Sequence, residues 1–165
     1  MASPMQELLQ AADRIEALAA GAVERWGATR EALAENRPGP GEWSAKEVVG
    51  HLIDSASNNH QRFVRLQLVD GLDFPDYGAD NEAWVRLQRY RERPWPELLA
   101  LWRGFNGHLA HVMRSVDPDC LENLWVIDTD RSISLRAMMV DYVGHLELHV
   151  RQIEVAMMTA QGQLD

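Results

Sequence analysis

The chain has 165 residues, 46% of them hydrophobic, and its 25 acidic residues outnumber its 16 basic ones to give a formal net charge of −9. This length fits one domain, 1–165, that can bury a core without disulfides. The negative charge would repel a phosphate backbone, so we expect no nucleic-acid partner. No apolar run reaches the roughly 18 residues of a membrane span, and the first residues lack the features of a signal peptide. We therefore expect a cytoplasmic protein with no membrane partner.

The single cysteine, Cys120, limits the kinds of site that the chain can form. One thiol excludes an intramolecular disulfide and any zinc cluster built from cysteines. Any metal site must therefore use histidine and carboxylate side chains.

The first predicted helix covers residues 5–35. Apolar residues recur three or four positions apart from Leu8 to Leu33, with glutamate and arginine on the other face, as in an amphipathic helix. The loop at 38–41, Pro-Gly-Pro-Gly, ends this helix.

The second predicted helix runs from Ser44 to about residue 69. Ser44 and Glu47 have the spacing of a capping box, in which each side chain accepts a hydrogen bond from the backbone amide of the other residue. Polar residues recur three or four positions apart along this helix and form either a solvated face or part of a functional site. These residues are His51, Asp54, Ser55, Asn58, Arg62 and Arg65.

Between residues 71 and 116 the sequence predicts a loop and two helices. The loop at 71–80 contains aromatic residues, which we expect to pack over one end of the molecule. A short helix follows at about 80–91, and a longer one at about 95–116 has a proline in its first turn.

The last part of the chain predicts a long connection at 117–131, extended at 124–127, and a final helix at about 134–158 capped by Ser132 or Ser134. The four long helices, with almost no strand signal, predict an all-α four-helix bundle. A long connection and a short extra helix lie between its second and third helices.

Three histidines are candidate metal ligands. His145 and His149 lie one turn apart on the same face of the last helix, so both imidazoles can reach one ion. His51, in the second helix, supplies a third imidazole unless it faces water. Three histidines from two helices would leave the fourth tetrahedral position to water or substrate, as in catalytic zinc sites.

His108 and His111 form a competing pair at i, i+3 in the helix predicted over 95–116. No third candidate lies near them in the sequence. We therefore interpret this pair as surface or interface residues rather than as ligands.

Two carboxylates are candidate catalytic residues. Asp54 lies one turn after His51, and Asp141 lies one turn before His145. Either carboxylate could accept the free N–H of an imidazole or act as a general base. Asp141 also has a purely structural interpretation, because the helix macrodipole favours an acid in the first half of a helix.

Three segments resemble the DinB/YfiT-like superfamily. Residues 42–54, EWSAKEVVGHLID, are similar to its second-helix signature, and residues 145–153, HLELHVRQI, to its C-terminal H-x-x-x-H-x-x-Q-I pattern. Residues 81–90, NEAWVRLQRY, resemble its DinB-2 branch. The resemblance implies a four-helix bundle, commonly a homodimer, that holds a divalent metal through His51, His145 and His149. Imidazole ligands suit several metals, among which we expect zinc or nickel.

The resemblance leaves three hypotheses for function. Relatives include thiol-dependent S-transferases, so the first is a transferase that uses a low-molecular-weight thiol, whose carboxylates Arg62 and Arg65 could bind unless they are ordinary surface arginines. The second is a metal-dependent hydrolase on the same site. The third is a non-catalytic bundle with a structural metal or none. For the two enzymes we expect a small-molecule substrate.

Overall fold

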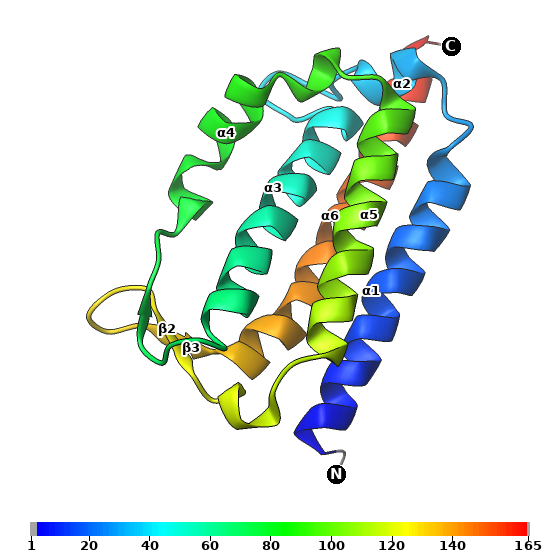
Figure 1. The fold of residues 1–165 in the computed structure, drawn as a ribbon. Helices are drawn as coiled ribbons and strands as arrows, with labels where there is room; N and C mark the ends of the chain where they lie inside the picture. Colours follow the sequence, from blue (N-terminus) through cyan, green and yellow to red (C-terminus); the bar gives the residue numbers. More distant parts are fainter. Residues whose placement is uncertain (1–2, 165) are drawn as a thin grey trace.

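The computed structural model describes residues 3–164, and its long helices run side by side along the molecule (Figure 1). The long helices are α1 (Pro4–Trp26), α3 (Ala45–Arg65), α5 (Trp95–Arg114) and α6 (Leu135–Leu164). Helices α1 and α3 each pack against both α5 and α6. This arrangement confirms the predicted four-helix bundle and places α3 beside α6, the two helices that carry the candidate ligands.

The first helix is shorter than predicted. A single helix over 5–35 is wrong, because α1 ends at Trp26 and a separate short helix, α2, covers Glu31–Glu35. The Trp26 carbonyl accepts hydrogen bonds from the Thr29 amide and from the Trp95 indole, both at 2.9 Å, so it is not available to continue the helix. Helix α2 is held by Lys46, whose buried ammonium pairs with Glu31 and with Glu35.

Helix α3 begins where the capping box predicts. The Ser44 hydroxyl accepts from the Glu47 amide at 3.3 Å, and the Glu47 carboxylate accepts from the Ser44 amide at 2.9 Å. The helix ends at Arg65, before the predicted residue 69. A solvated face is the wrong interpretation of its polar residues, because all of them except Arg65 are buried.

A small sheet lies beside the end of α3 and the start of α6 (Figure 1). Its strands are β1 (Leu72–Asp73), β2 (Leu124–Val126) and β3 (Ser132–Ser134), in the order β1-β2-β3. Strand β1 pairs parallel to β2, and β2 pairs antiparallel to β3. The extended segment predicted at 124–127 is thus confirmed, whereas β1 and β3 are too short for their alternation to be recognised in the sequence.

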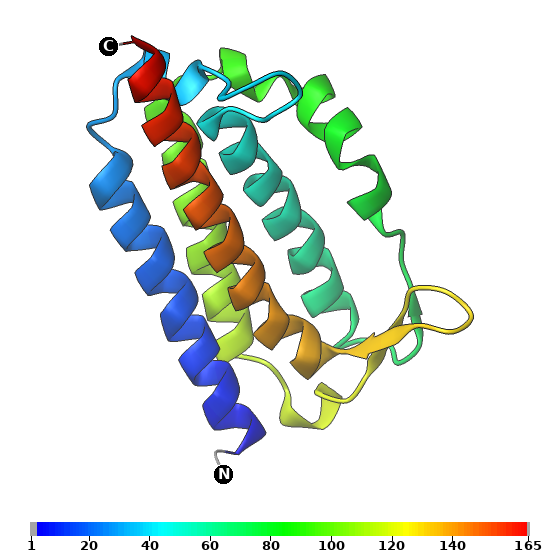
Figure 2. The same ribbon diagram turned by 180° about the vertical axis from the view of Figure 1, so that it is seen from behind.

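The connection between α3 and α5 carries helix α4 (Asn81–Gln88), flanked by the 3₁₀ helices η1 (Tyr77–Asp80) and η2 (Tyr90–Glu92). Figure 2 shows this segment on the outside of α3. The predicted helix at 80–91 is interrupted at Arg89, which has a φ of 54°.

The second connection contains η3 (Pro118–Cys120) and leads into α6. The Ser134 hydroxyl accepts from the Ala137 amide at 3.3 Å, so Ser134 rather than Ser132 is the cap. Helix α6 continues beyond the predicted end at 158.

None of the helices in residues 3–164 combines the length and the apolar character that crossing a bilayer requires.

Candidate metal centre

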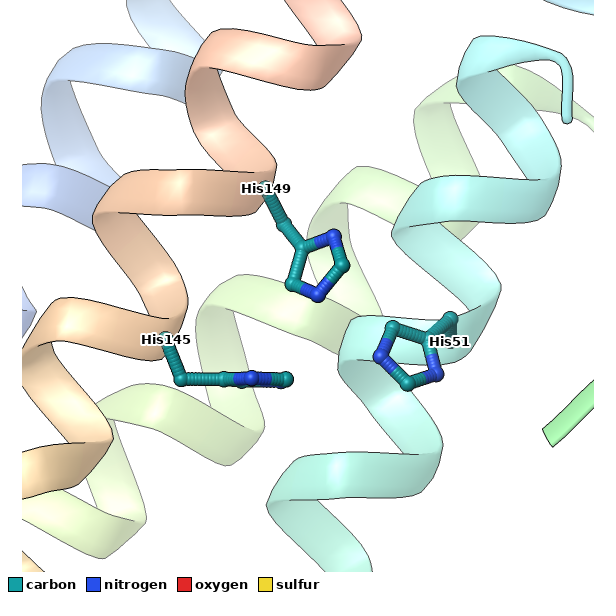
Figure 3. Close-up of side chains that lie close together, drawn as sticks. All are labelled: His51, His145 and His149. Carbon is teal, nitrogen blue, oxygen red and sulfur yellow. The ribbon is translucent and has the colours of Figure 1, made fainter. Parts of the chain in front are cut away.

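The three candidate histidines meet between α3 and α6 (Figure 3). Each offers one ring nitrogen, and these three atoms lie within 4.8 Å of one another. The ring centroid of His149 is 4.7 Å from that of His51 and 4.6 Å from that of His145, and the His51 and His145 centroids are 5.4 Å apart. The i, i+4 spacing on α6 presents two imidazoles to the one on α3, as predicted.

His51 is enclosed rather than exposed. Only 4% of its surface is accessible, so the alternative in which it faces water is wrong. The Trp43 ring lies 5.3 Å from the imidazole, and the Tyr77 ring lies 6.5 Å away. The residues before α3 and in η1 therefore shield this side of the site.

The hydrogen bonding of the three rings fits a bound cation. Nδ1 of His51 and Nε2 of His145 are buried and have no hydrogen-bond partner within residues 3–164. Such atoms are unfavourable unless something satisfies them. The Nδ1 of His149 lies 2.7 Å from Oε1 of the Gln152 side chain, so this nitrogen donates and Nε2 is left with a free lone pair. These neutral nitrogen donors suit a transition metal.

The environment keeps the imidazoles uncharged at neutral pH. Burial, together with repulsion from the neighbouring imidazoles, lowers the pKa of His51 to about 3. The same causes lower the pKa of His145 to about 4. Burial also lowers the pKa of His149, although the hydrogen bond to Gln152 partly opposes it. Because only neutral imidazole binds a metal, the triad is preorganised as a ligand set.

A cavity of about 250 Å³ lies beside the triad. Two of the three histidines line it, together with side chains from η1, β2, α3 and α6. The lining includes Arg62, Tyr77, Trp125 and Asp141. The sequence contained no signal for Tyr77 and Trp125, because they lie in connections whose path only the fold defines.

The two candidate carboxylates lie in different surroundings. Asp141 is exposed and lines the cavity. Asp54 is buried, and its Oδ1 accepts hydrogen bonds from the Tyr90 hydroxyl and from the side-chain amide of Gln88, both at 2.6 Å. Burial raises the pKa of Asp54, although these bonds partly offset the effect. The structure thus ties Asp54 to the α4–η2 segment and leaves Asp141 beside the cavity.

The two arginines also differ. Arg62 is 5% exposed, lines the cavity, and has its guanidinium 3.8 Å from the Trp125 ring centroid. Its Nη2 donates to the Pro75 carbonyl and to Asp76, both at 3.3 Å, while the buried Nε has no partner in the described part of the chain. Arg65 is exposed. Of the two, Arg62 is therefore the one that lines the cavity beside the triad.

Comparison with known protein families identifies the family of the chain. A family model described as the DinB superfamily matches residues 7–153. The chain belongs to the DinB superfamily. This finding confirms the resemblance of the three sequence segments.

Two relatives in this superfamily carry the name "putative metal-dependent hydrolase". One, from Oceanobacillus iheyensis, is 25% identical over 123 residues, which are 74% of this chain and 69% of the relative. The other, YfiT from Bacillus subtilis, is 29% identical over 115 residues, which are 68% of this chain but only 63% of YfiT.

The solved structure of Bacillus subtilis YfiT superposes with a TM-score of 0.79, at 23% identity, over 94% of this chain and 88% of YfiT. YfiT is described as a probable metal-dependent hydrolase with an unusual four-helix bundle topology. At this level of identity the likeness establishes the shared fold.

Proposed function

We propose that this protein is a metal-dependent hydrolase of a small-molecule substrate, with His51, His145 and His149 as the ligands of one zinc or nickel ion. The observation that carries the proposal is the convergence of three neutral imidazoles, two with unsatisfied buried nitrogens, beside a cavity of about 250 Å³. Two relatives named as metal-dependent hydrolases support it.

In such a site the ion, when bound, polarises a carbonyl or phosphoryl oxygen and makes a water molecule more acidic. The residues of the chain perform the remaining tasks. Gln152 holds the His149 ring in one tautomer and orientation. Asp141, beside the cavity, accepts the proton of the attacking water as general base. Tyr77 and Trp125 enclose the substrate and exclude bulk water.

A thiol-dependent S-transferase is the second candidate, and Arg62 is the observation that favours it. A buried guanidinium on the cavity wall would hold the carboxylate of a low-molecular-weight thiol. The thiol sulfur would then attack an electrophilic carbon of the substrate, form a C–S bond and displace a leaving group, in the position where the hydrolase mechanism has water attack a carbonyl or phosphoryl group. Product formation that requires added thiol identifies the transferase, and product formation in its absence identifies the hydrolase.

Metal content is the first test of the proposed site. Protein purified without a histidine tag should retain about one divalent ion per chain, because three ligands of one ion are preformed. His51→Ala, His145→Ala and His149→Ala should each lose the ion on dialysis, whereas His108→Ala should keep it. Elemental analysis measures this content, and equal metal in all four variants would contradict the assignment.

Activity is the second test. The metal-loaded protein is screened against small esters, amides and phosphate esters, with and without thiol. Turnover that disappears in His145→Ala establishes a metal-dependent enzyme. A loaded protein without turnover on any of these substrates would favour the non-catalytic bundle.

The homodimer implied by the resemblance stays a prediction. Sedimentation measures the mass of the protein in solution and so tests it.

A further inference from the structure

A second group of histidines lies between α3 and α5, apart from the metal centre. Nε2 of His60 on α3 is 3.3 Å from Nε2 of His108 on α5, and their ring centroids are 5.0 Å apart. His111, one turn further along α5, has its ring centroid 6.2 Å from that of His108. The sequence predicted no third histidine near His108 and His111, because His60 is brought to them only by the packing of α3 against α5.

The separation of the two nitrogens matches that of two ligands on one ion. With Zn–N bonds of 2.0–2.1 Å and tetrahedral angles, two ligand nitrogens are about 3.3–3.4 Å apart. His60 and His108 therefore need no backbone movement to chelate a cation. His108 is exposed and His60 is half-buried, so an ion can enter from solvent.

This pair is distinct from the first site. His51 and His60 are nine residues apart on α3, which is about 13 Å along the helix axis. The partner of His51 is α6, whereas the partner of His60 is α5. An ion bound by the His60–His108 pair therefore has no ligand in common with an ion bound by the triad.

We propose that His60 and His108 form a second, exchangeable site for a divalent transition metal such as Cu²⁺, Ni²⁺ or Zn²⁺. Imidazole nitrogen selects these ions over Mg²⁺ and Ca²⁺, which prefer oxygen ligands. Two protein ligands leave the remaining positions to water, so the ion binds more weakly than at the triad. A change in its side-chain rotamer brings His111 into the site as a further ligand, and the ion then binds more strongly. The bound ion links α3 to α5 and stabilises the fold.

A direct hydrogen bond between the two imidazoles is the alternative explanation of the same geometry. In that case one ring donates to the other and the pair has no affinity for metal. Burial and the neighbouring His108 also lower the pKa of His60, which favours the neutral form of His60 in either case. Only metal binding separates the two explanations.

The test is a titration of the folded, full-length protein, after its triad is filled, with Ni²⁺ or Cu²⁺ in a calorimeter. We expect one additional ion per chain and a rise in Tm. His60→Gln and His108→Gln should each weaken this binding at least about tenfold, since even the loss of a residue that only supports a ligand costs 10–100-fold. His111→Gln should weaken it less. Arg103→Gln, an exposed change on the same helix, is the control.

A measurement on the unmodified protein complements the variants. Diethyl pyrocarbonate labels accessible neutral imidazoles, and added Ni²⁺ should protect His60 and His108 together while leaving His111 less protected. Absence of the extra ion, binding unchanged by both Gln variants, or unprotected labelling would each overturn the proposal. Retention of the triad's metal and of any hydrolysis in His108→Gln is expected, so this proposal and the proposed function fail independently.

Discussion

His149 illustrates how a single residue outside the ligand set shapes the site. Its Nδ1 lies 2.7 Å from the side-chain amide oxygen, Oε1, of Gln152, three residues later on α6. This bond fixes which nitrogen carries the proton and how the ring is oriented. His51 and His145 are held by burial instead. Gln152 is therefore a positioning residue for the proposed metal.

Removal of that support gives a prediction at this scale. Gln152→Ala should weaken metal binding about 10–100-fold without unfolding the protein, because the side chain is exposed and supports only the ring of His149. Competition with a chromophoric chelator measures the affinity. Arg151→Ala, an exposed neighbour, serves as control, and equal affinities in the two variants would show that Gln152 does not act on the metal.

At the scale of elements, α3 carries His51 of the candidate metal centre. Its outer face holds the α4–η2 segment, with the Tyr90 ring against the backbone of Gly50 and the Tyr90 hydroxyl on Asp54. A Cβ at Gly50 would lie 2.0 Å from the Tyr90 ring. A glycine one residue before a candidate metal ligand is thus required by close packing rather than by an unusual backbone conformation.

Gly50→Ala should accordingly lower the free energy of unfolding by about 1–3 kcal/mol, the usual cost of inserting a methyl group into a packed site. Gly104→Ala on α5 is the matched control. Apart from its two chain neighbours and the nearby backbone of its own helix, no heavy atom lies within 4 Å of a Cβ built there, so the change should stabilise the helix by about 0.5–1 kcal/mol. Urea unfolding of both variants measures the difference, and equal effects would disprove the close contact.

The start of α3 provides a pH-dependent contribution. Burial raises the pKa of Glu47, but hydrogen bonds from Arg37 and from the Ser44 backbone outweigh it, so the net pKa is lowered. A carboxylate with a lowered pKa stabilises the fold above the ordinary value of about 4.5, and the contribution is lost as the pH falls through the lowered pKa.

Glu47→Gln should therefore lower the free energy of unfolding by about 1 kcal/mol at pH 7, because the charged hydrogen bond from Arg37 is lost while the cap remains. The difference from the unmodified protein should shrink below pH 4.5. Glu24→Gln, an exposed change on α1, is the control. A difference that stays constant down to pH 3 would contradict the assigned role of the charge.

At the scale of the whole molecule, the triad joins the two helices that flank the cavity. A ligand that binds only the folded state stabilises it in proportion to the logarithm of its concentration over Kd. Removal of the metal with a chelator should therefore lower Tm, and restoring it should reverse the change. His145→Ala should show no chelator effect attributable to the triad. Unchanged Tm in the unmodified protein would mean that no metal bridges α3 and α6.

The sequence predicted the parts of this architecture that depend on local patterns. Apolar periodicity located the four long helices, and the Ser44–Glu47 spacing located the start of α3. The i, i+4 pair on α6 and the distant His51 converge as expected. These features are short-range, or follow directly from packing two amphipathic helices together.

The features that the sequence did not predict depend on contacts between distant residues. The end of α1 at Trp26 reflects a hydrogen bond from Trp95, and the His60–His108 pair reflects the packing of α3 on α5. Strands of two or three residues show too little alternation to be recognised. Local patterns cannot encode such partners, which exist only once the chain has folded.

The burial of Lys46 has a practical consequence for solution studies. It is the only lysine in the chain, and it is 2% exposed beneath α2, where it also donates to the Arg91 carbonyl at 2.9 Å. An amine-reactive reagent can reach this side chain only when the segments that cover it, α2 or η2, move away. The rate at which Lys46 is acylated in the native protein therefore reports how often that corner of the molecule opens, without any engineered probe.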